Sequence, residues 1–248
     1  MKRFLTVFSA AALIALSLLS VVGCDLERKV QGIEFKFRNK VAKATEMSFF
    51  ADLKVEDESG TSTLGVNCYM KNGEYAYTFV SPDAKKAEYR ELYADQKFYE
   101  FLSASSMPIG SYYVKDDVKP ESENNLIYQI KQNILAATYA TLIVEGKKDK
   151  VGDADTYRYD FSYGGNDYSL WYDDENLVKI AAVFRSTDEE GTVHEEKYSA
   201  VFSEYVFSDV TDKPFTRPED GAYVESPISF ESWMAILTDF SSRAAKWM

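Results

Sequence analysis

The feature of this sequence that most restricts its fold is an alternation of large apolar and polar residues between positions 155 and 207. Side chains of a β-strand point alternately to its two faces, so this period predicts strands with one buried face. Short polar runs interrupt the alternation at 164–166, 173–176 and 188–191. Such turns between consecutive strands indicate an antiparallel meander. The apolar phase shifts near Ser203 and Glu204, which predicts a bulge or bend there.

The same period of two occurs in the first half of the chain. It predicts strands at about 47–55, 62–71, 75–79, 86–94, 97–103 and 112–114. Asn72 and Gly73 predict a tight hairpin, because both residues tolerate the positive φ that such a turn needs. Asp95 and Gln96 mark a second turn between strands. The sequence therefore predicts antiparallel strands in both halves.

Three segments, 26–46, 122–140 and 229–246, have apolar residues three or four apart, which is the spacing of an amphipathic helix. The first has a lysine-rich exposed side, and an alternation from Ile33 to Phe37 leaves a strand as the alternative. The second is expected to cover one face of a sheet, with a movable cover over a ligand cavity as the alternative. The third is too apolar to stay in water. We expect it to dock on the open side or edge of the sheet, with a bilayer or a partner as alternatives.

The N-terminus has the pattern of an export signal. Lys2 and Arg3 precede an apolar run that ends at Cys24. The segment Val21-Val22-Gly23-Cys24 resembles the lipobox of a bacterial lipoprotein signal peptide. This resemblance implies removal of residues 1–23, acylation of Cys24 with chains such as palmitate, and attachment to the extracytoplasmic face of the cell membrane. Two other interpretations fit the same run, a cleaved secretory signal and an uncleaved transmembrane helix.

Composition limits the partners of the mature chain. Without residues 1–23, 225 residues remain, which is enough for one large domain with a sizeable core or for two small ones. The formal charge is −12, and it becomes −14 once Lys2 and Arg3 are removed. Such a balance repels phosphate backbones and anionic lipid headgroups. We therefore expect no nucleic-acid partner, and we expect the lipid anchor rather than surface attraction to hold the domain at the membrane.

No set of residues in the sequence points to catalysis. Cys24 and Cys68 are the only cysteines, so no disulfide framework is expected, and Cys68 has the phase of a core position. The single histidine, His194, has no visible nucleophile beside it and is expected at an exposed strand end. The usual zinc ligands are lacking, and Asp173-Asp174-Glu175 does not have the spacing of a calcium loop. We therefore expect a non-enzymatic protein without cofactor or metal, and keep a hydrolase of envelope polymers as a third hypothesis.

Aromatic residues are the remaining candidates for binding. The chain has 18 tyrosines, 16 phenylalanines and 3 tryptophans, most of them in the predicted strands. Faces rich in such rings stack on carbohydrate or line a lipid cavity, and they also fill the core of a curved sheet. The candidate ligand-binding residues are Tyr159, Phe161, Trp171 and Phe184. The residues expected on the buried, concave side of the sheet are Tyr159, Phe161, Val178, Ile180 and Phe184.

Three segments of the second half have a recognisable order of strands and turns. They are the run Leu170-Trp171-Tyr172-Asp173-Asp174-Glu175-Asn176-Leu177-Val178-Lys179-Ile180, the stretch from Glu190-Gly191 to Phe202–Phe207, and the run Pro214–Gly221. Together they resemble the C-terminal half of the LolA-like superfamily of lipoprotein and lipid carriers. The resemblance implies an α+β fold, in which a curved antiparallel β-sheet, an unclosed half-barrel, is covered by helices with acyl chains between them.

The sequence is expected to have three parts. A signal peptide at 1–23 is followed by a LolA-like half-barrel domain at 24–224 and by a C-terminal amphipathic helix at 225–248. The chain departs from the family in having its own lipid anchor and this extra helix. No ligand residue of the family maps onto this sequence.

Two functional hypotheses from different classes follow. The leading one is a membrane-anchored, extracytoplasmic lipoprotein that binds lipid or another apolar ligand in a half-barrel cavity. The alternative is a structural or regulatory lipoprotein with a filled core that acts through a protein partner. The two differ in whether the aromatic face of the sheet is open to a ligand.

Overall fold

The computed structural model describes residues 32–80, 87–104, 107–118, 144–163, 165–188, 190–221, 223–227 and 230. The strands are β1 (Glu46–Asp57), β2 (Gly60–Lys71), β3 (Glu74–Val80), β4 (Ala87–Ala94), β5 (Lys97–Ala104), β6 (Gly110–Lys115), β7 (Lys147–Val151), β8 (Ala154–Tyr163), β9 (Asn166–Tyr172), β10 (Leu177–Thr187), β11 (Val193–Val206) and β12 (Tyr223–Glu225). The other elements are helix α3 (Ile33–Lys43) and the 3-10 turns η1 (Lys213–Phe215) and η2 (Pro218–Asp220). The expected signal peptide, Cys24 and the helices over 122–140 and 229–246 lie outside the described residues, apart from Phe230.

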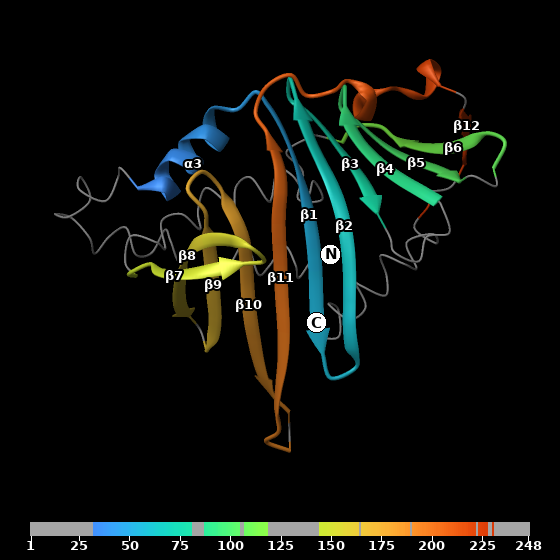
Figure 1. Cartoon of the computed structure of the whole chain (residues 1–248). Coiled ribbons are helices and arrows are strands. Elements are labelled where there is room, and N and C mark those ends of the chain that lie inside the picture. Colours follow the sequence, from blue (N-terminus) through green and yellow to red (C-terminus); the bar gives the residue numbers. More distant parts are fainter. Residues whose placement is uncertain are drawn as a thin grey trace.

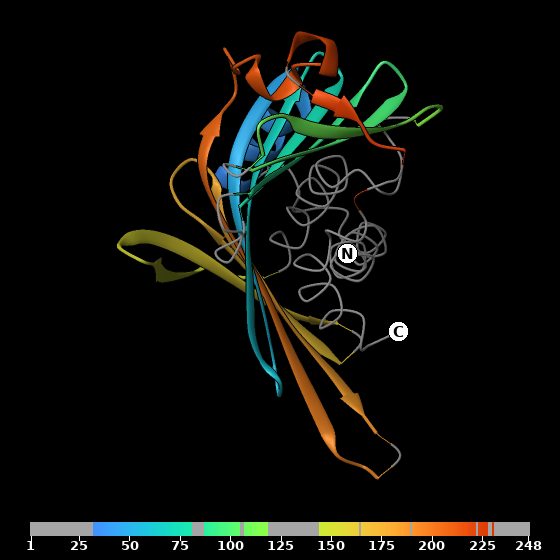
Figure 2. The ribbon, with the colours of Figure 1, turned by 90° about the vertical axis from the view of Figure 1, so that its right-hand side faces the viewer.

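All twelve strands belong to one curved sheet in the order β12-β6-β5-β4-β3-β2-β1-β11-β10-β9-β8-β7 (Figure 1). Two antiparallel meanders, β1–β6 and β7–β11, meet where β1 pairs with β11. The short strand β12 adds parallel to β6. Because β12 and β7 remain at the two ends, the described sheet is not closed, and Figure 2 shows how strongly it curves and twists. The prediction of a curved, unclosed, mostly antiparallel sheet is confirmed.

Helices contribute little to the described part of the chain. Within it α3 is the only α-helix, so the described fold is mainly β rather than α+β with several covering helices. Phe37 and Val41 on α3 are fully buried against the sheet core, which confirms the helical interpretation of this segment. None of the described helices has the length and apolar character needed to cross a bilayer.

The predicted tight turns are present. Asn72 and Gly73 both have positive φ, 52° and 82°, in the two-residue turn between β2 and β3. Asp95 and Gln96 have φ of 51° and 61° between β4 and β5. Positive φ at both central positions matches the right-handed twist of paired strands, so these turns set the register of the two hairpins.

Two bulges change which side chains reach the core. In β11, Ser203 pairs with Phe50 but Val206 pairs with Ser48, and Glu204 at the bulge has a φ of 57°. This confirms the bend predicted from the phase shift. In β10, Leu177 pairs with Tyr172 and Lys179 pairs with Trp171, so Val178 is the extra residue.

The second bulge corrects one expectation about the core. Leu177 is fully buried in the core, whereas Val178 is only half-buried and is not part of it. Ile180, Phe184 and the other expected residues do lie on the core side of their strands. The bulge has therefore moved the core position from Val178 to its neighbour.

One face of the sheet, here called the inner face, carries the main core. It is built from every second residue of β1–β4 and β8–β11 together with Phe37 and Val41 of α3. Cys68 lies in this core with no exposed surface, as its phase predicted. Burial raises the pKa of the Cys68 thiol well above its ordinary value, so it behaves as a small apolar side chain.

The opposite, outer face is covered over β3–β5 by the return segment, residues 207–221, which follows β11. Val210 and Phe215 of this segment join a second apolar cluster on the outer face. The buried guanidinium of Arg90 on β4 donates to the carbonyl oxygens of Pro214 and Thr216. Both faces of this half of the sheet are thus covered. The candidate binding surface is therefore the inner face of β8–β11.

Candidate functional site

Three of the four candidate ligand-binding residues lie on the inner face. Phe161 of β8 stacks on Tyr168 of β9 with ring centres 5.3 Å apart. Phe184 of β10 meets the rings of Tyr168 and Tyr198 edge-on, at 6.0 and 5.5 Å. We call these four rings the aromatic row. Tyr168 and Tyr198 are buried, whereas Phe161, Phe184 and the neighbouring Tyr159 are half-buried and pack against the core.

Trp171 does not belong to this group. Its neighbours on either side in β9 are part of the inner core, so its own side chain points to the outer face. There the indole Nε1 donates to Asp149 Oδ2 at 2.9 Å, and the cations of Arg158 and Lys179 lie 5.2 and 4.7 Å from its ring. The structure therefore corrects the sequence-based grouping, because Trp171 cannot share a site with the three inner-face residues.

Two buried carboxylates face each other on the inner face over β4 and β5. Glu91 and Glu100 are direct cross-strand partners, and they are 4% and 6% exposed. Directly opposite residues of an antiparallel pair have Cβ atoms about 4.5–5.5 Å apart. The Tyr89 hydroxyl donates to Glu91 Oε1 at 3.2 Å, and the backbone N–H of Phe230 donates to Glu100 Oε2 at 2.8 Å. Charged groups are rarely buried to this degree, so the pair stands out among the described inner-face residues.

The surroundings of Glu91 favour its neutral form. Burial, and then the negative charge of Glu100, raise the pKa of Glu91 to about 8, while the hydrogen bond from Tyr89 opposes this shift. Two carboxyl groups this close cannot both ionise easily, because each negative charge disfavours the other. The pair can therefore take up or release a proton near neutral pH. The described residues place no third His, Cys, Asp or Glu beside the pair that would complete a metal site.

A third buried carboxylate lies beside the aromatic row. Glu196 of β11 is 1% exposed, pairs across the strands with Phe184, and accepts a hydrogen bond of 2.6 Å from the Tyr198 hydroxyl. Sequence reasoning missed Glu91, Glu100 and Glu196 because it searched for catalytic motifs. The signal was present in the strand phase, since each glutamate has at least one aromatic residue two places away on the same face of its strand.

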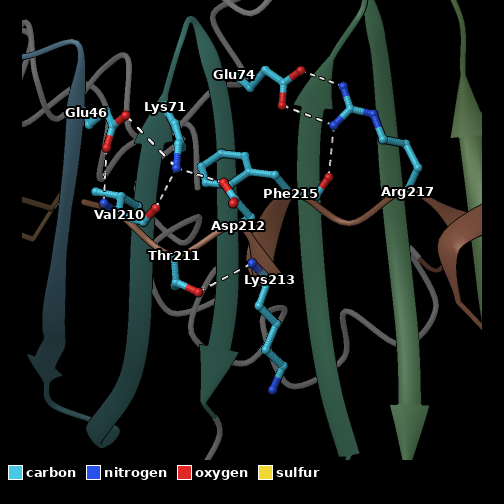
Figure 3. Close-up of polar contacts among 9 residues, drawn as sticks. All are labelled: Glu46, Lys71, Glu74, Val210, Thr211, Asp212, Lys213, Phe215 and Arg217. Atoms are coloured by element: carbon cyan, nitrogen blue, oxygen red, sulfur yellow. Dashed lines mark hydrogen bonds and ion pairs between the residues drawn. The ribbon is translucent and has the colours of Figure 1, made fainter. Parts of the chain in front are cut away.

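Figure 3 shows a second group of polar contacts, on the outer face where the return segment crosses the strand ends. Lys71 Nζ pairs with Asp212 at 2.7 Å, and Arg217 binds both carboxylate oxygens of Glu74. Residues of this group line a hollow of about 320 Å³. Both cations already have an anionic partner, so these contacts attach the return segment to the sheet.

The other residues considered for chemistry have structural roles. His194 sits at a strand end between the carboxylates of Glu58 and Asp188, which lie 2.7 and 2.9 Å from its ring nitrogens. The hydrogen bonds to these carboxylates, first the one to Asp188, raise the pKa of His194. Asp173 accepts backbone hydrogen bonds from Glu175 and Asn176, which makes this acidic run an ordinary hairpin turn. Among the described residues no three His, Cys, Asp or Glu side chains are placed to hold a metal ion.

Comparisons with known proteins give similarity only at the level of solved structures. No family model matches the chain. No curated protein sequence matches it either. One similar structure is a DUF1329 family protein from Desulfovibrio piger, with a TM-score of 0.34 and 10% identity, covering 75% of this chain and 95% of that one.

Two other similar structures come from Vibrio parahaemolyticus and Pseudomonas aeruginosa. A domain described as an outer membrane lipoprotein-sorting protein from Vibrio parahaemolyticus has a TM-score of 0.28 and 9% identity over 75% of this chain and 96% of that one. A chain of the MucA/MucB complex of Pseudomonas aeruginosa has a TM-score of 0.35 and 10% identity over 76% of this chain and 61% of that one. Scores this low carry no argument about function, which therefore rests on the residues of this chain.

Proposed function

We propose that the chain is a non-enzymatic lipoprotein, anchored through Cys24 at the extracytoplasmic face of the cell membrane, that binds lipid or another apolar ligand. The observation that carries this proposal is the aromatic row. Phe161 and Phe184 remain half-buried on the inner face of a sheet whose described strands do not close. Partly open aromatic rings beside an apolar core favour an apolar ligand over a polar one.

The electrostatics of the inner face suit the same ligand class. An acyl chain avoids charge, because an ionised group that loses water without a partner is strongly destabilised. The carboxylate beside the aromatic row, Glu196, accepts a hydrogen bond of 2.6 Å from the Tyr198 hydroxyl, so it is not left without a partner. The LolA-like resemblance of the sequence points to lipid or lipoprotein carriers as well. Ligand binding at the aromatic row thus agrees with the partial exposure of its rings and with the pairing of the carboxylate beside it.

A second candidate function is a lipoprotein that acts through a protein partner. The observation that favours it is the burial of the inner face over β1–β4, where the rings of Tyr77 and Tyr89 have no exposed surface and that of Tyr93 is 2% exposed. A core filled in this way has no room for a ligand, and the sheet would then serve as a rigid support for a surface that meets a partner.

Native mass spectrometry of the mature, gently extracted protein separates the two functions. A ligand-binding protein is expected to carry additional mass that fragments into a lipid. The acyl groups on Cys24 are covalent and remain on the peptide, so they are distinguished from a released ligand. A mass equal to the acylated chain alone, at every extraction condition, would contradict ligand binding and support the partner function.

Truncation of the aromatic row should reduce the bound ligand. In the variant Phe161→Ala we expect at least half of the co-purifying ligand to be lost, because the stacked pair with Tyr168 is broken. Phe161 is only half-buried, so the free energy of unfolding should fall by about 1–2 kcal/mol, less than the ~3–5 kcal/mol typical of a fully buried phenylalanine. Val183→Ala, at a half-buried position on the outer face of β10, is the matched control and should keep its ligand. Equal ligand loss in both variants would point to unfolding instead of a lost contact.

Replacement of the anchoring residue tests the localisation. In the variant Cys24→Ser the precursor should stay uncleaved by the lipoprotein signal peptidase and unlabelled by a fatty-acid probe, because serine offers no thiol for the diacylglyceryl group. The measurement is gel mobility together with probe incorporation in cells. Equal labelling of the variant and the unchanged chain would disprove the lipobox.

A further inference from the structure

Helix α3 is amphipathic, and its exposed side is basic. Phe37 and Val41 are fully buried, whereas Lys36, Lys40 and Lys43 are exposed. The three lysines are three or four positions apart, so they share one side of the helix. This side is positive in a chain whose 40 acidic residues outnumber 28 basic ones.

These lysines are not neutralised by neighbours. Elsewhere in the described part of the chain, lysines such as Lys54, Lys71 and Lys97 form ion pairs with carboxylates. Lys36, Lys40 and Lys43 form none with any described residue; Lys40 Nζ instead lies 4.6 Å from the centre of the Phe207 ring. Lysines in the last turn of a helix interact favourably with the negative end of the helix dipole. This interaction explains the positions of Lys40 and Lys43 but not that of Lys36.

The helix also lies close in sequence to the proposed anchor. Cys24 is nine positions before Ile33, the first residue of α3. Even a fully extended linker of this length spans only about 30 Å. The anchor therefore keeps α3 near the lipid headgroups, whereas the far strands of the sheet are not restricted in this way.

We propose that the basic side of α3 binds anionic lipid headgroups of the membrane that holds the anchor, and so orients the domain on it. This inference rests on the proposed acylation of Cys24. Lysine side chains are attracted to an anionic lipid surface. At 0.1 M salt this attraction is largely screened once the lysine is more than about 10 Å from the surface. The mature chain, with its net charge of −14, repels the same surface, so the domain turns the basic side of α3 toward the membrane and its acidic remainder away.

The test uses the full acylated protein reconstituted into vesicles. The exposed Asn39 on the same helix is replaced by cysteine and labelled with a fluorophore, and the buried Cys68 does not react. One vesicle is phosphatidylcholine alone, and the other contains phosphatidylglycerol and phosphatidylcholine at about 1:2. A water-soluble quencher should act about twofold more slowly on the label in the anionic vesicle, and the difference should vanish at about 1 M salt, where screening is nearly complete.

Two charge-reversal variants decide the role of the helix. Lys36→Glu, Lys40→Glu and Lys43→Glu together should abolish the difference between the two vesicles. The matched control reverses the three exposed lysines of edge strand β7, Lys147→Glu, Lys148→Glu and Lys150→Glu, and should leave the difference unchanged. Equal quenching of the unchanged chain in both vesicles, or equal loss in the two variants, would overturn the proposal.

The experiment distinguishes an incorrect proposal about the anchor from an incorrect proposal about the helix. A chain that floats with phosphatidylcholine vesicles but shows no response to anionic lipid retains the anchor and overturns only the role of α3. A chain that lacks acyl mass and does not float with phosphatidylcholine overturns the anchor, and the proposed orientation falls with it.

Discussion

The free energy of unfolding should fall as the pH rises from about 5 to about 9, and the variant Glu91→Gln should remove most of this fall. The pKa of Glu91 is about 8 in the folded chain, against an ordinary value of 4.5. Between these two values the folded chain holds a proton that the unfolded chain has lost. Stability therefore declines with rising pH in this window, by at most about 1.4 kcal/mol per pH unit, and the decline is complete above the folded pKa.

Glutamine isolates this effect because it resembles the neutral carboxyl group. Its amide oxygen can still accept from Tyr89, and its amino group can donate to Glu100, but it does not ionise. At pH 5 the variant and the unchanged chain should have similar stability. At pH 9 the variant should be more stable by roughly 2–4 kcal/mol, measured by urea unfolding across the pH series.

Other groups also titrate between about pH 5 and pH 9. The conclusion therefore depends on how the pH dependence of stability differs between Glu91→Gln and a control variant. Asp188 holds the pKa of His194 above its ordinary value, and this contribution is the same in both chains. The matched control is Glu88→Gln, an exposed glutamate on the same strand, and it should follow the unchanged chain at every pH. Parallel pH profiles for Glu91→Gln and Glu88→Gln would show that Glu91 is ionised in the folded protein.

The variant Phe37→Ala should reduce the free energy of unfolding by about 3–5 kcal/mol, the range for a fully buried phenylalanine. Phe37 has no exposed surface, and its ring meets Tyr205 at 5.3 Å and both Tyr172 and Phe207 at 6.4 Å. These contacts join α3 to β9, to β11 and to the start of the return segment. The alanine leaves a cavity at this junction, so all these contacts are lost together.

The same variant should release α3 from the sheet. An isolated helix of 11 residues is marginal in water, so α3 depends on this contact for its structure. Urea unfolding measures the stability, and amide exchange over 36–43 reports the helix itself. Asn39→Ala, an exposed change on the same helix, should stay within about 0.5 kcal/mol. A loss below about 1 kcal/mol for Phe37→Ala would mean that α3 does not pack on the sheet through this ring.

Local patterns in the sequence determined the strands and their connections. The period of two placed β1–β6 and β8–β11, because a strand with one buried face repeats its apolar side chains every second residue. It did not place the edge strands β7 and β12, which lack this alternation of large apolar residues. Asn72-Gly73 and Asp95-Gln96 identified hairpins through residues that tolerate positive φ. The bulge at Glu204 was visible as a change of phase. All of these depend on neighbours a few residues apart.

The candidate site could be predicted from the sequence only in part. Phe161 and Phe184 were found from residue type and strand phase, and the structure brings them together through Tyr168. Trp171 was grouped with them on residue type alone. The alternation along β9 already places its side chain on the opposite face of the sheet from those of its two neighbours. The bulge at Val178 had no visible signal, since Leu177 and Val178 are both apolar.

Only the tertiary structure decided which strands and faces meet. Nothing local requires β1 to pair with β11, the return segment to cross the outer face, or β12 to join β6 in parallel. Likewise, Glu91 and Glu100 each have the phase of a buried position, but their pairing depends on the register of β4 with β5. A strand's sequence encodes which side chains share a face, whereas its partner is selected by burial and backbone hydrogen bonding over the whole sheet. The sequence by itself therefore determined helix α3 and most of the described strands, and long-range packing determined their order and the charges that the core encloses.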